Sequence, residues 1–152
     1  MKPAIRRGGA DDARAAADLY LRGRAAALRA GSIPPGVHDD DDVRGHFGSH
    51  VVEDCELWVA EQDGALAGIL VLDGDFVDQL YVEPRLTARG IGSALLAVAK
   101  RERPQGLQLW AFQSNTGARR FYERHGFVEV RRTDGRDNEE GAPDVLYWYR
   151  AS

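Results

Sequence analysis

The segment from residue 76 to residue 103 joins a predicted strand, a glycine-containing turn and an amphipathic helix in direct succession. Branched and aromatic residues predict a strand over Phe76–Val82, and Pro84 ends it because proline has no N–H for a β-ladder. The helix is predicted to begin near Gly92. Its apolar residues follow the i, i+3, i+4, i+7 pattern of a core-facing helix, at Ile91, Ala94, Leu95 and Val98.

Strands and helices are predicted along the whole chain in the order βα(α)βββαβαββ, which indicates a mixed α/β (α+β) sheet with both kinds of strand pairing. Asp11 or Asp12 is expected to cap a first helix that ends near Gly31, and a short helix is expected through Val43 and Phe47. The other predicted elements are strands at Ala4–Arg6, Leu57–Ala60, Leu66–Leu72, Leu107–Ala111, Phe127–Val130 and Val145–Tyr149, and a helix at Thr116–His125.

Length and composition favour one domain spanning residues 1–152, because 152 residues with 43% hydrophobic content suffice for a single core. A net charge of −4 argues against a nucleic-acid-binding protein. Cys55 is the only cysteine, so no intramolecular disulfide is possible. No leader-like apolar region follows the N-terminus and no apolar run reaches membrane-spanning length, so a cytoplasmic protein without membrane partners is expected.

The turn before the second long helix has the features of an anion-binding site. Gly90 and Gly92 let backbone N–H groups approach an anion closely, and the helix dipole adds positive charge there. A plain tight turn is the alternative. A dinucleotide motif would need glycine where Leu95 stands, and a P-loop would need lysine where Ile91 follows Gly90. A phosphate or pyrophosphate is therefore predicted outside the usual nucleotide-binding folds.

Two segments resemble motifs of the GNAT superfamily of acyl-CoA-dependent N-acyltransferases. The first runs from Leu80 to Pro84 and continues from Ala88 to Leu96; the second runs from Asn115 to Phe127. The resemblance extends from Ile5 to Tyr149 and also covers the order of strands and helices. It implies a single-domain fold with a mostly antiparallel sheet, a splayed central strand and about four flanking helices.

The same resemblance implies acetyl-CoA as co-substrate and assigns its binding residues. Backbone groups of Leu80 and Val82 would hold the pantetheine arm as an added strand. Asn115 would contact the pantetheine or cap the following helix. Thr87 stands where the family usually has arginine or glutamine, so Arg89 is expected to supply the positive charge. The pyrophosphate would bind the N–H groups of Ala88, Arg89, Gly90, Ile91, Gly92 and Ser93.

Tyr122 matches the position of the family's general acid, which would protonate the departing thiolate. From its position alone a core aromatic is the alternative, because Ala118 and Phe121 share its helical face. No residue stands out as general base. Asp78 and Glu61 are candidates, with solvated edge charges as the alternative for both.

The remaining polar segments carry weaker signals. The spacing of His38, His46 and His50 matches no standard ligand pattern, so no metal site is predicted. The acidic run 39–42 is hypothesised to attract a cationic amine. The polar stretch 132–144 is interpreted as a hairpin loop or a lid over the acceptor.

The predicted function is direct transfer of an acetyl group from acetyl-CoA to a primary amine of a small molecule, in a ternary complex. Two alternatives stay open: a peptide or protein N-acetyltransferase, and a non-catalytic acyl-CoA-binding module. A homodimer is the commonest symmetric assembly for such a protein.

Overall fold

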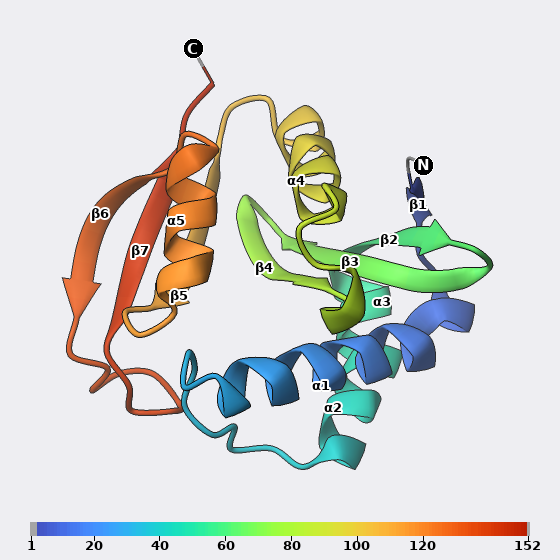
Figure 1. The fold of residues 1–152 in the computed structure, drawn as a ribbon, viewed down its shortest axis with the longest axis horizontal. Coiled ribbons are helices and arrows are strands. Elements are labelled where there is room, and N and C mark those ends of the chain that lie inside the picture. The colour runs from blue at the N-terminus through green and yellow to red at the C-terminus, as the bar shows by residue number, and fades with distance from the viewer. Residues whose placement is uncertain (1–2, 152) are drawn as a thin grey trace.

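A seven-stranded sheet with helices on both faces makes up the computed structural model, which describes residues 3–151 (Figure 1). The strands are β1 (Ala4–Arg7), β2 (Glu56–Gln62), β3 (Ala65–Asp73), β4 (Phe76–Val82), β5 (Leu107–Phe112), β6 (Val128–Thr133) and β7 (Asp144–Tyr149). The helices are α1 (Ala13–Arg29), α2 (Asp40–His46), α3 (Val52–Asp54), α4 (Ile91–Glu102) and α5 (Thr116–Arg124), with a π-helical turn at Phe47–Val51.

The strand order is β1-β2-β3-β4-β5-β7-β6, and every neighbouring pair is antiparallel except β4 and β5. A parallel pair needs a crossover connection, and α4 provides it between these two strands. The mixed, mostly antiparallel sheet predicted from the sequence is thereby confirmed.

Two apolar clusters lie on opposite faces of the sheet, and β3 contributes to both. Ile69 and Val71 pack in the cluster that includes α1, whereas Leu70 and Leu72 pack in the cluster that includes α4. This alternation follows from the two-residue period of a strand, and it explains why β3 is apolar along almost its whole length. Within residues 3–151, no helix combines the length and the apolar character needed to cross a bilayer.

The predicted elements are confirmed with two differences. The short helix expected near Val43 and Phe47 belongs to a longer helical segment, which begins where the Asp39 carboxylate accepts the Asp42 N–H at 2.8 Å. The predicted cap of α1 is wrong in its chemistry. Asp12 occupies the cap position, but its carboxylate accepts the Gly9 N–H and pairs with Arg6 instead of bonding the helix amides.

Gly23 allows α1 to lie close against β4, and it leads to a prediction about stability. A Cβ built on Gly23 would lie 2.5 Å from Cδ1 of Tyr81. Gly23→Ala is therefore expected to lower the free energy of unfolding by about 1–3 kcal/mol, since the aromatic ring or the helix must shift. Thermal unfolding measures this as a fall of roughly 2–4 °C per kcal/mol for a chain of this size.

Gly45→Ala in α2 is the matched control, because no atom lies within 4 Å of the Cβ it would add. Removing a helical glycine in open space is expected to raise stability by about 0.5–1 kcal/mol. A rise in melting temperature for both variants would contradict the proposed close packing at Gly23.

Candidate active site

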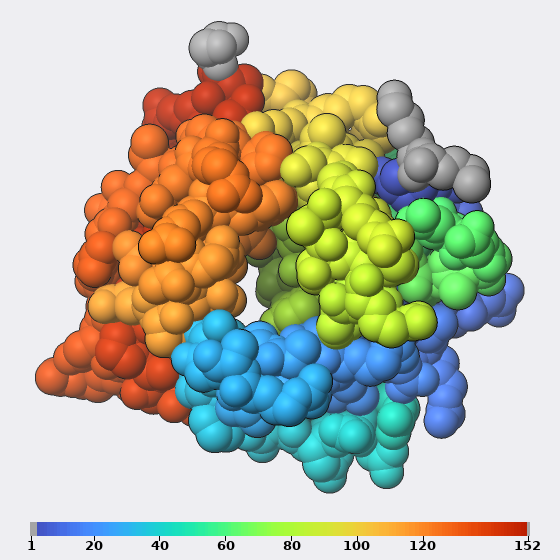
Figure 2. All heavy atoms as spheres, viewed as in Figure 1, coloured from blue at the N-terminus to red at the C-terminus, as the bar shows by residue number. Residues whose placement is uncertain are grey.

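β4 and β5 are neighbours in the sheet that separate along most of their length. Within residues 3–151, a single register pair, Phe76 with Gln108, joins them, next to a hydrogen bond of 2.9 Å from the Gln108 N–H to the Asp75 carbonyl. Figure 2 shows an opening at the centre of this face, bounded by α5, α1 and the segment around α4. Two cavities meet inside it.

A β-bulge lies in the middle of β4, on the edge of this opening. Val71 pairs with Gln79 and Leu72 pairs with Val77, so Asp78 is an extra residue without a partner in β3. A bulge bends its strand and redirects the side chain of the extra residue. Asp78 consequently lines the cavity on the α1 side of the opening.

The first cavity, called here the α4-side cavity, has a volume of about 660 Å³. It lies between β4, the start of α4 and one face of α5. Its lining consists of Leu80, Val82, Leu86, Thr87, Ala88, Gly90, Ile91, Gly92, Ser93, Gly117, Ala118, Phe121, Tyr122 and Arg124. The amino end of a helix therefore opens directly into an extended hollow.

That helix end presents unpaired N–H groups to the cavity. Gly90 precedes α4 with a φ of +84°, and a glycine has no side chain that could cap the helix. The first intrahelical bond runs from the Ala94 N–H to the Gly90 carbonyl at 3.0 Å, so the amides of residues 91–93 have no partner within the helix. Together with the helix dipole they favour an anion such as a pyrophosphate.

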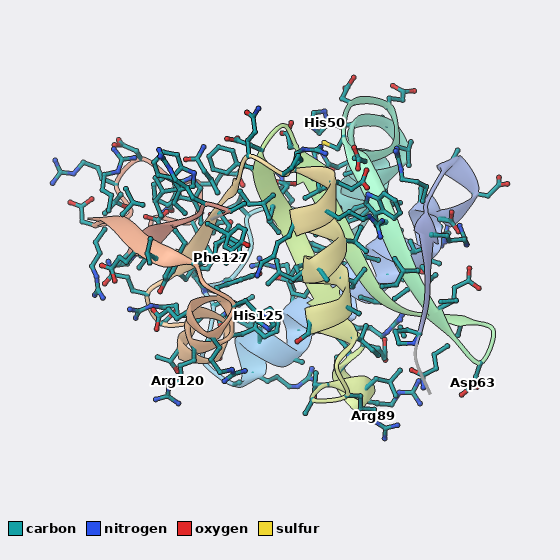
Figure 3. All side chains as sticks on the ribbon, turned by 90° about the horizontal axis from the view of Figure 1, so that it is seen from above. His50, Asp63, Arg89, Arg120, His125 and Phe127 are labelled. Carbon is teal, nitrogen blue, oxygen red and sulfur yellow. The ribbon has the colours of Figure 1, made fainter. Side chains whose placement is uncertain are left out.

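The cation at this cavity is Arg124, at the carboxyl end of α5. Arg89 is exposed and is not among the lining residues, and Figure 3 shows it projecting from the loop before α4. The structure therefore gives no support to the expected role of the Arg89 side chain. Both arginines are exposed, but only Arg124 lies at the rim of the cavity, because the end of α5 borders it.

His125 connects α5 to α4 beside the helix end (Figure 3). Its Nε2 lies 3.1 Å from the Ser93 hydroxyl, and Lys100 Nζ donates to its carbonyl oxygen at 2.7 Å. Partial burial and the charges of Lys100 and Arg124 lower the pKa of His125 below its usual value. The ring is therefore neutral at physiological pH and positions Ser93 without adding charge.

Tyr122 lies where the two cavities meet, since it lines both together with Leu80 and Ala118. Its ring packs against Phe121 and Phe127, with centroid distances of 5.3 and 5.5 Å. Burial raises the pKa of the Tyr122 hydroxyl well above its usual value. Among residues 3–151 no side chain or carbonyl is bonded to this hydroxyl, so a protonated group is free to donate into the opening.

The second cavity, called here the α1-side cavity, has a volume of about 300 Å³, and most of its charged lining residues are acidic. Asp78, Glu139 and Glu140 line it, opposed by Arg24. Burial raises the pKa of Asp78 above its usual value, and the nearby carboxylate of Asp73 adds to this shift. An excess of carboxylates in a confined space favours a cationic guest.

Two loops close over the α1 side of the opening. His38 Nε2 pairs with Glu139 Oε1 at 3.0 Å, and the Ser114 hydroxyl donates to the Ser32 carbonyl at 2.7 Å. The loop after α1 thus contacts both the β6–β7 loop and the β5–α5 loop. The stretch 132–144, interpreted from sequence as a hairpin loop or a lid, forms part of this wall.

Comparison with known proteins identifies the family. The family model of the acetyltransferase (GNAT) domain matches residues 53–129. The chain belongs to the GNAT acetyltransferase family. Solved structures show the same fold. One is YjaB of Escherichia coli in its apo form, with a TM-score of 0.78, 22% sequence identity and an alignment that covers 100% of both chains. PaiA N-acetyltransferase of Thermoplasma acidophilum, solved with coenzyme A, also matches (TM-score 0.70, 14% identity, 99% of both chains).

Two curated relatives of this GNAT domain are named as peptidyl-lysine N-acetyltransferases. YiaC of Escherichia coli is 38% identical over 74 residues, which cover 48% of this chain and 50% of YiaC. YjaB of Salmonella typhimurium is 33% identical over 88 residues, covering 57% of this chain and 59% of YjaB. The chain therefore spans between half and two thirds of the length of these relatives.

Most of the residues predicted as site residues lie together in this GNAT domain. Leu80, Val82, Ala88, Gly90, Ile91, Gly92, Ser93 and Tyr122 all line the α4-side cavity. Asn115 caps α5 by accepting the Ala118 N–H at 3.3 Å, and it lines the α1-side cavity instead. Glu61 pairs with Arg6 on β1 and lines neither cavity, whereas Asp78 lines the α1-side cavity.

The structure adds residues that the sequence did not single out. Leu86, Gly117, Ala118, Phe121 and Arg124 complete the α4-side cavity, and Glu139 and Glu140 contribute to the α1-side cavity. The signal for Phe121 and Arg124 was the second motif, in which both residues stand three positions apart and so share one side of the helix. The two glutamates had no local signal, because only the folded loop brings them to the opening.

Proposed function

We propose that this GNAT domain is an N-acetyltransferase that transfers an acetyl group from acetyl-CoA directly to a primary amine that arrives as a cation. One observation carries the proposal: a cavity suited to a pyrophosphate and a cavity suited to a cation meet at Tyr122. Direct transfer needs both substrates at one point with a proton donor between them, and this arrangement provides such a point.

In this proposal the α4-side cavity holds acetyl-CoA. The amides of residues 91–93 and the guanidinium of Arg124 bind the pyrophosphate, and the free edge of β4 at Leu80 and Val82 binds the pantetheine arm. Because β4 is no longer paired with β5 at these residues, its backbone N–H and C=O groups on that edge are available to an extended ligand. Thr87 lines the cavity and offers a hydroxyl in place of the charge that the family usually has there.

The chemistry assigns one step to each of two side chains. Asp78 accepts a proton from the ammonium through water, and the neutral nitrogen attacks the carbonyl carbon of the thioester. The C–N bond forms, the C–S bond breaks, and the sulfur leaves with the proton of the Tyr122 hydroxyl. After the C–N bond has formed, the nitrogen loses a second proton, and this proton returns the Tyr122 phenolate to its neutral form.

A small free amine is the first choice of acceptor, because the bridged loops 32–39 and 134–143 narrow access to the α1-side cavity. A lysine side chain of a peptide or protein is the second choice, since YiaC and YjaB are named for that acceptor. Both present an alkylammonium group to the same carboxylates. The one-domain organisation over residues 1–152 and a homodimeric assembly stay predictions.

The test is incubation with acetyl-CoA and a panel of small diamines, polyamines and lysine-containing peptides. Release of free thiol and the mass of the product identify the acceptor. Acetylation of peptides alone would overturn the small-amine choice. If acetyl-CoA raises the melting temperature but no amine is acetylated, the proposed enzymatic function would be replaced by the alternative, a non-catalytic acyl-CoA-binding module.

Asp78→Asn is expected to lower kcat/KM for the amine by about 10²-fold at neutral pH, the usual magnitude for loss of a general base. The same variant is expected to raise the melting temperature of the free protein. Burial raises the pKa of Asp78, so ionisation of this carboxyl opposes folding, and the penalty increases as pH rises through that pKa. Steady-state kinetics and thermal unfolding measure the two effects.

Glu61→Gln is the control, because Glu61 lies outside both cavities. It is expected to leave the kinetics unchanged. An equal fall in kcat/KM for the two variants, or an unchanged value for Asp78→Asn, would contradict the role of Asp78.

A further inference from the structure

A group of metal-ligating side chains lies outside the two cavities, at the junction between the helical segment 40–54 and the end of β3. His50 belongs to the π-helical turn, Cys55 follows α3 directly, and Asp73 is the last residue of β3. Figure 3 shows His50 at the edge of the molecule opposite Arg89. Neither the glycine turn nor the acyl-transfer chemistry uses any of these residues.

Two of the ligand atoms already lie at the separation that one small ion requires, and the third lies nearby. One ligand atom from each of His50, Cys55 and Asp73 lies within 4.8 Å of the other two. The Cys55 Sγ and the His50 Nε2 are 3.6 Å apart. Tetrahedral zinc has Zn–S bonds of about 2.3 Å and Zn–N bonds of about 2.0–2.1 Å, which places two such ligands about 3.6 Å apart.

The other ring nitrogen of His50 is already held by a carboxylate. Asp54 Oδ2 lies 3.2 Å from the His50 Nδ1. When Nδ1–H donates to this carboxylate, Nε2 is left with its lone pair directed toward Cys55. Metal-binding histidines almost always have such a partner, which fixes the tautomer and the ring orientation. The helical spacing of His50 and Asp54 creates this pair locally.

The backbone around Cys55 is equally well defined. Its N–H bonds to the Val51 carbonyl at 3.2 Å, which continues the helical segment to this residue. Asp73 is held at the other end by pairing with Phe76 across the β3–β4 turn.

We propose that His50, Cys55 and Asp73 bind a divalent transition-metal ion, with Zn²⁺ as the best match, and that Asp54 orients His50. The ligands are Nε2, Sγ and one carboxylate oxygen. A set that includes thiolate and imidazole selects zinc over magnesium or calcium, which prefer oxygen ligands. Binding displaces the thiol proton to solvent and leaves a fourth position for water, because His50 and Asp73 are exposed.

The ion would join the helical segment to the sheet. Phe47 and Val51 of the π-helical turn are buried in the cluster that includes α1, and they line a third cavity, to which Asp78 also contributes. Because His50 directly precedes Val51, the metal site adjoins one wall of this third cavity. Its existence does not depend on acetyl transfer, so its test needs no substrate.

The experiment is a titration of chelator-treated protein with Co²⁺ and then with Zn²⁺. The expected result is one Co²⁺ per chain, with a thiolate-to-cobalt charge-transfer band in the near ultraviolet and intense visible bands of tetrahedral type. Zn²⁺ should displace the cobalt and raise the melting temperature. Absence of the charge-transfer band would overturn the proposal.

Variants separate this site from adventitious binding. Cys55→Ser should abolish the band, and Asp73→Asn, at an exposed position that tolerates the change, should weaken Zn²⁺ binding. Asp54→Asn should weaken it by about 10–100-fold, the usual effect of removing a carboxylate behind a histidine ligand. Circular dichroism of the metal-free variants shows whether each is folded.

His46→Gln is the matched control, since the His46 ring stacks on His50 at 4.9 Å but is no member of the ligand group. Its affinity for Zn²⁺ should equal that of the wild type. Equal losses in His46→Gln and His50→Gln would indicate adventitious surface binding only. Wild-type affinity in Cys55→Ser would likewise exclude the proposed thiolate ligand.

Discussion

Tyr122→Phe is expected to lower kcat by about 10²-fold and to leave the affinity for acetyl-CoA unchanged. The ring would remain between Phe121 and Phe127, so packing is retained and only the hydroxyl is lost. Tyr122 lines both cavities where they meet, and the raised pKa of its hydroxyl keeps that group protonated at neutral pH. Single-turnover kinetics measure the chemical step, and thermal unfolding with acetyl-CoA measures binding.

Tyr149→Phe is the matched control for this experiment. Tyr149 packs on Phe127 in the same aromatic group, at a centroid distance of 5.4 Å, but it lines neither cavity. Removal of the Tyr149 hydroxyl in Tyr149→Phe should therefore leave kcat unchanged. An unchanged kcat in Tyr122→Phe would exclude Tyr122 as the acid, and an equal fall in both variants would indicate a packing effect.

Gly90→Ala is expected to weaken acetyl-CoA binding by at least about tenfold. Gly90 has a φ of +84°, a conformation that costs an alanine about 1–2 kcal/mol, and its peptide groups orient the free amides at the start of α4. For the wild type, acetyl-CoA at about 100 times Kd should add about 2.7 kcal/mol to the free energy of unfolding. With tenfold weaker binding, the same ligand concentration is only about 10 times the Kd of Gly90→Ala, so the gain should fall to about half, roughly 1.4 kcal/mol or less.

Gly64→Ala distinguishes loss of binding from loss of stability. Gly64 has a φ of +79°, and, as at Gly90, nothing lies within 4 Å of an added Cβ. It lies in the β2–β3 turn, outside the α4-side cavity. Both variants should therefore lose similar stability without ligand, and only Gly90→Ala should show a reduced response to acetyl-CoA. A full response in Gly90→Ala would contradict the proposed role of the helix end.

The glycine turn and the second motif could be predicted because their geometry is local. Gly90 lies one turn from the amides it exposes, and Asn115 caps a helix that begins at the next residue. The strands were predictable for the same reason, since the run of branched apolar residues that predicts β3 is a local property of the sequence. Predictions of this kind depend on backbone conformation, which neighbouring side chains largely decide.

Predictions about where a charge points were less successful. Arg89 stands within the motif yet faces solvent, and Asp12 bonds Gly9 and Arg6 instead of the helix that it precedes. In both cases the sequence position was right and the side-chain direction was not. A long or charged side chain selects its partner from everything nearby in space, and most of those partners are distant in the sequence.

By itself, the sequence determined the family, the order of strands and helices, the glycine turn proposed to bind an anion, and the candidate acid Tyr122. The tertiary structure decided which groups surround them: Arg124 at the helix end, Asp78 redirected by a bulge, and Glu139 brought over the opening by a loop. It also brought Asp73 to Cys55 through the β2–β3 hairpin. The physical reason is that hydrogen-bonding and helical patterns act between neighbours, whereas charges and ligands act through space across segments that only folding brings together.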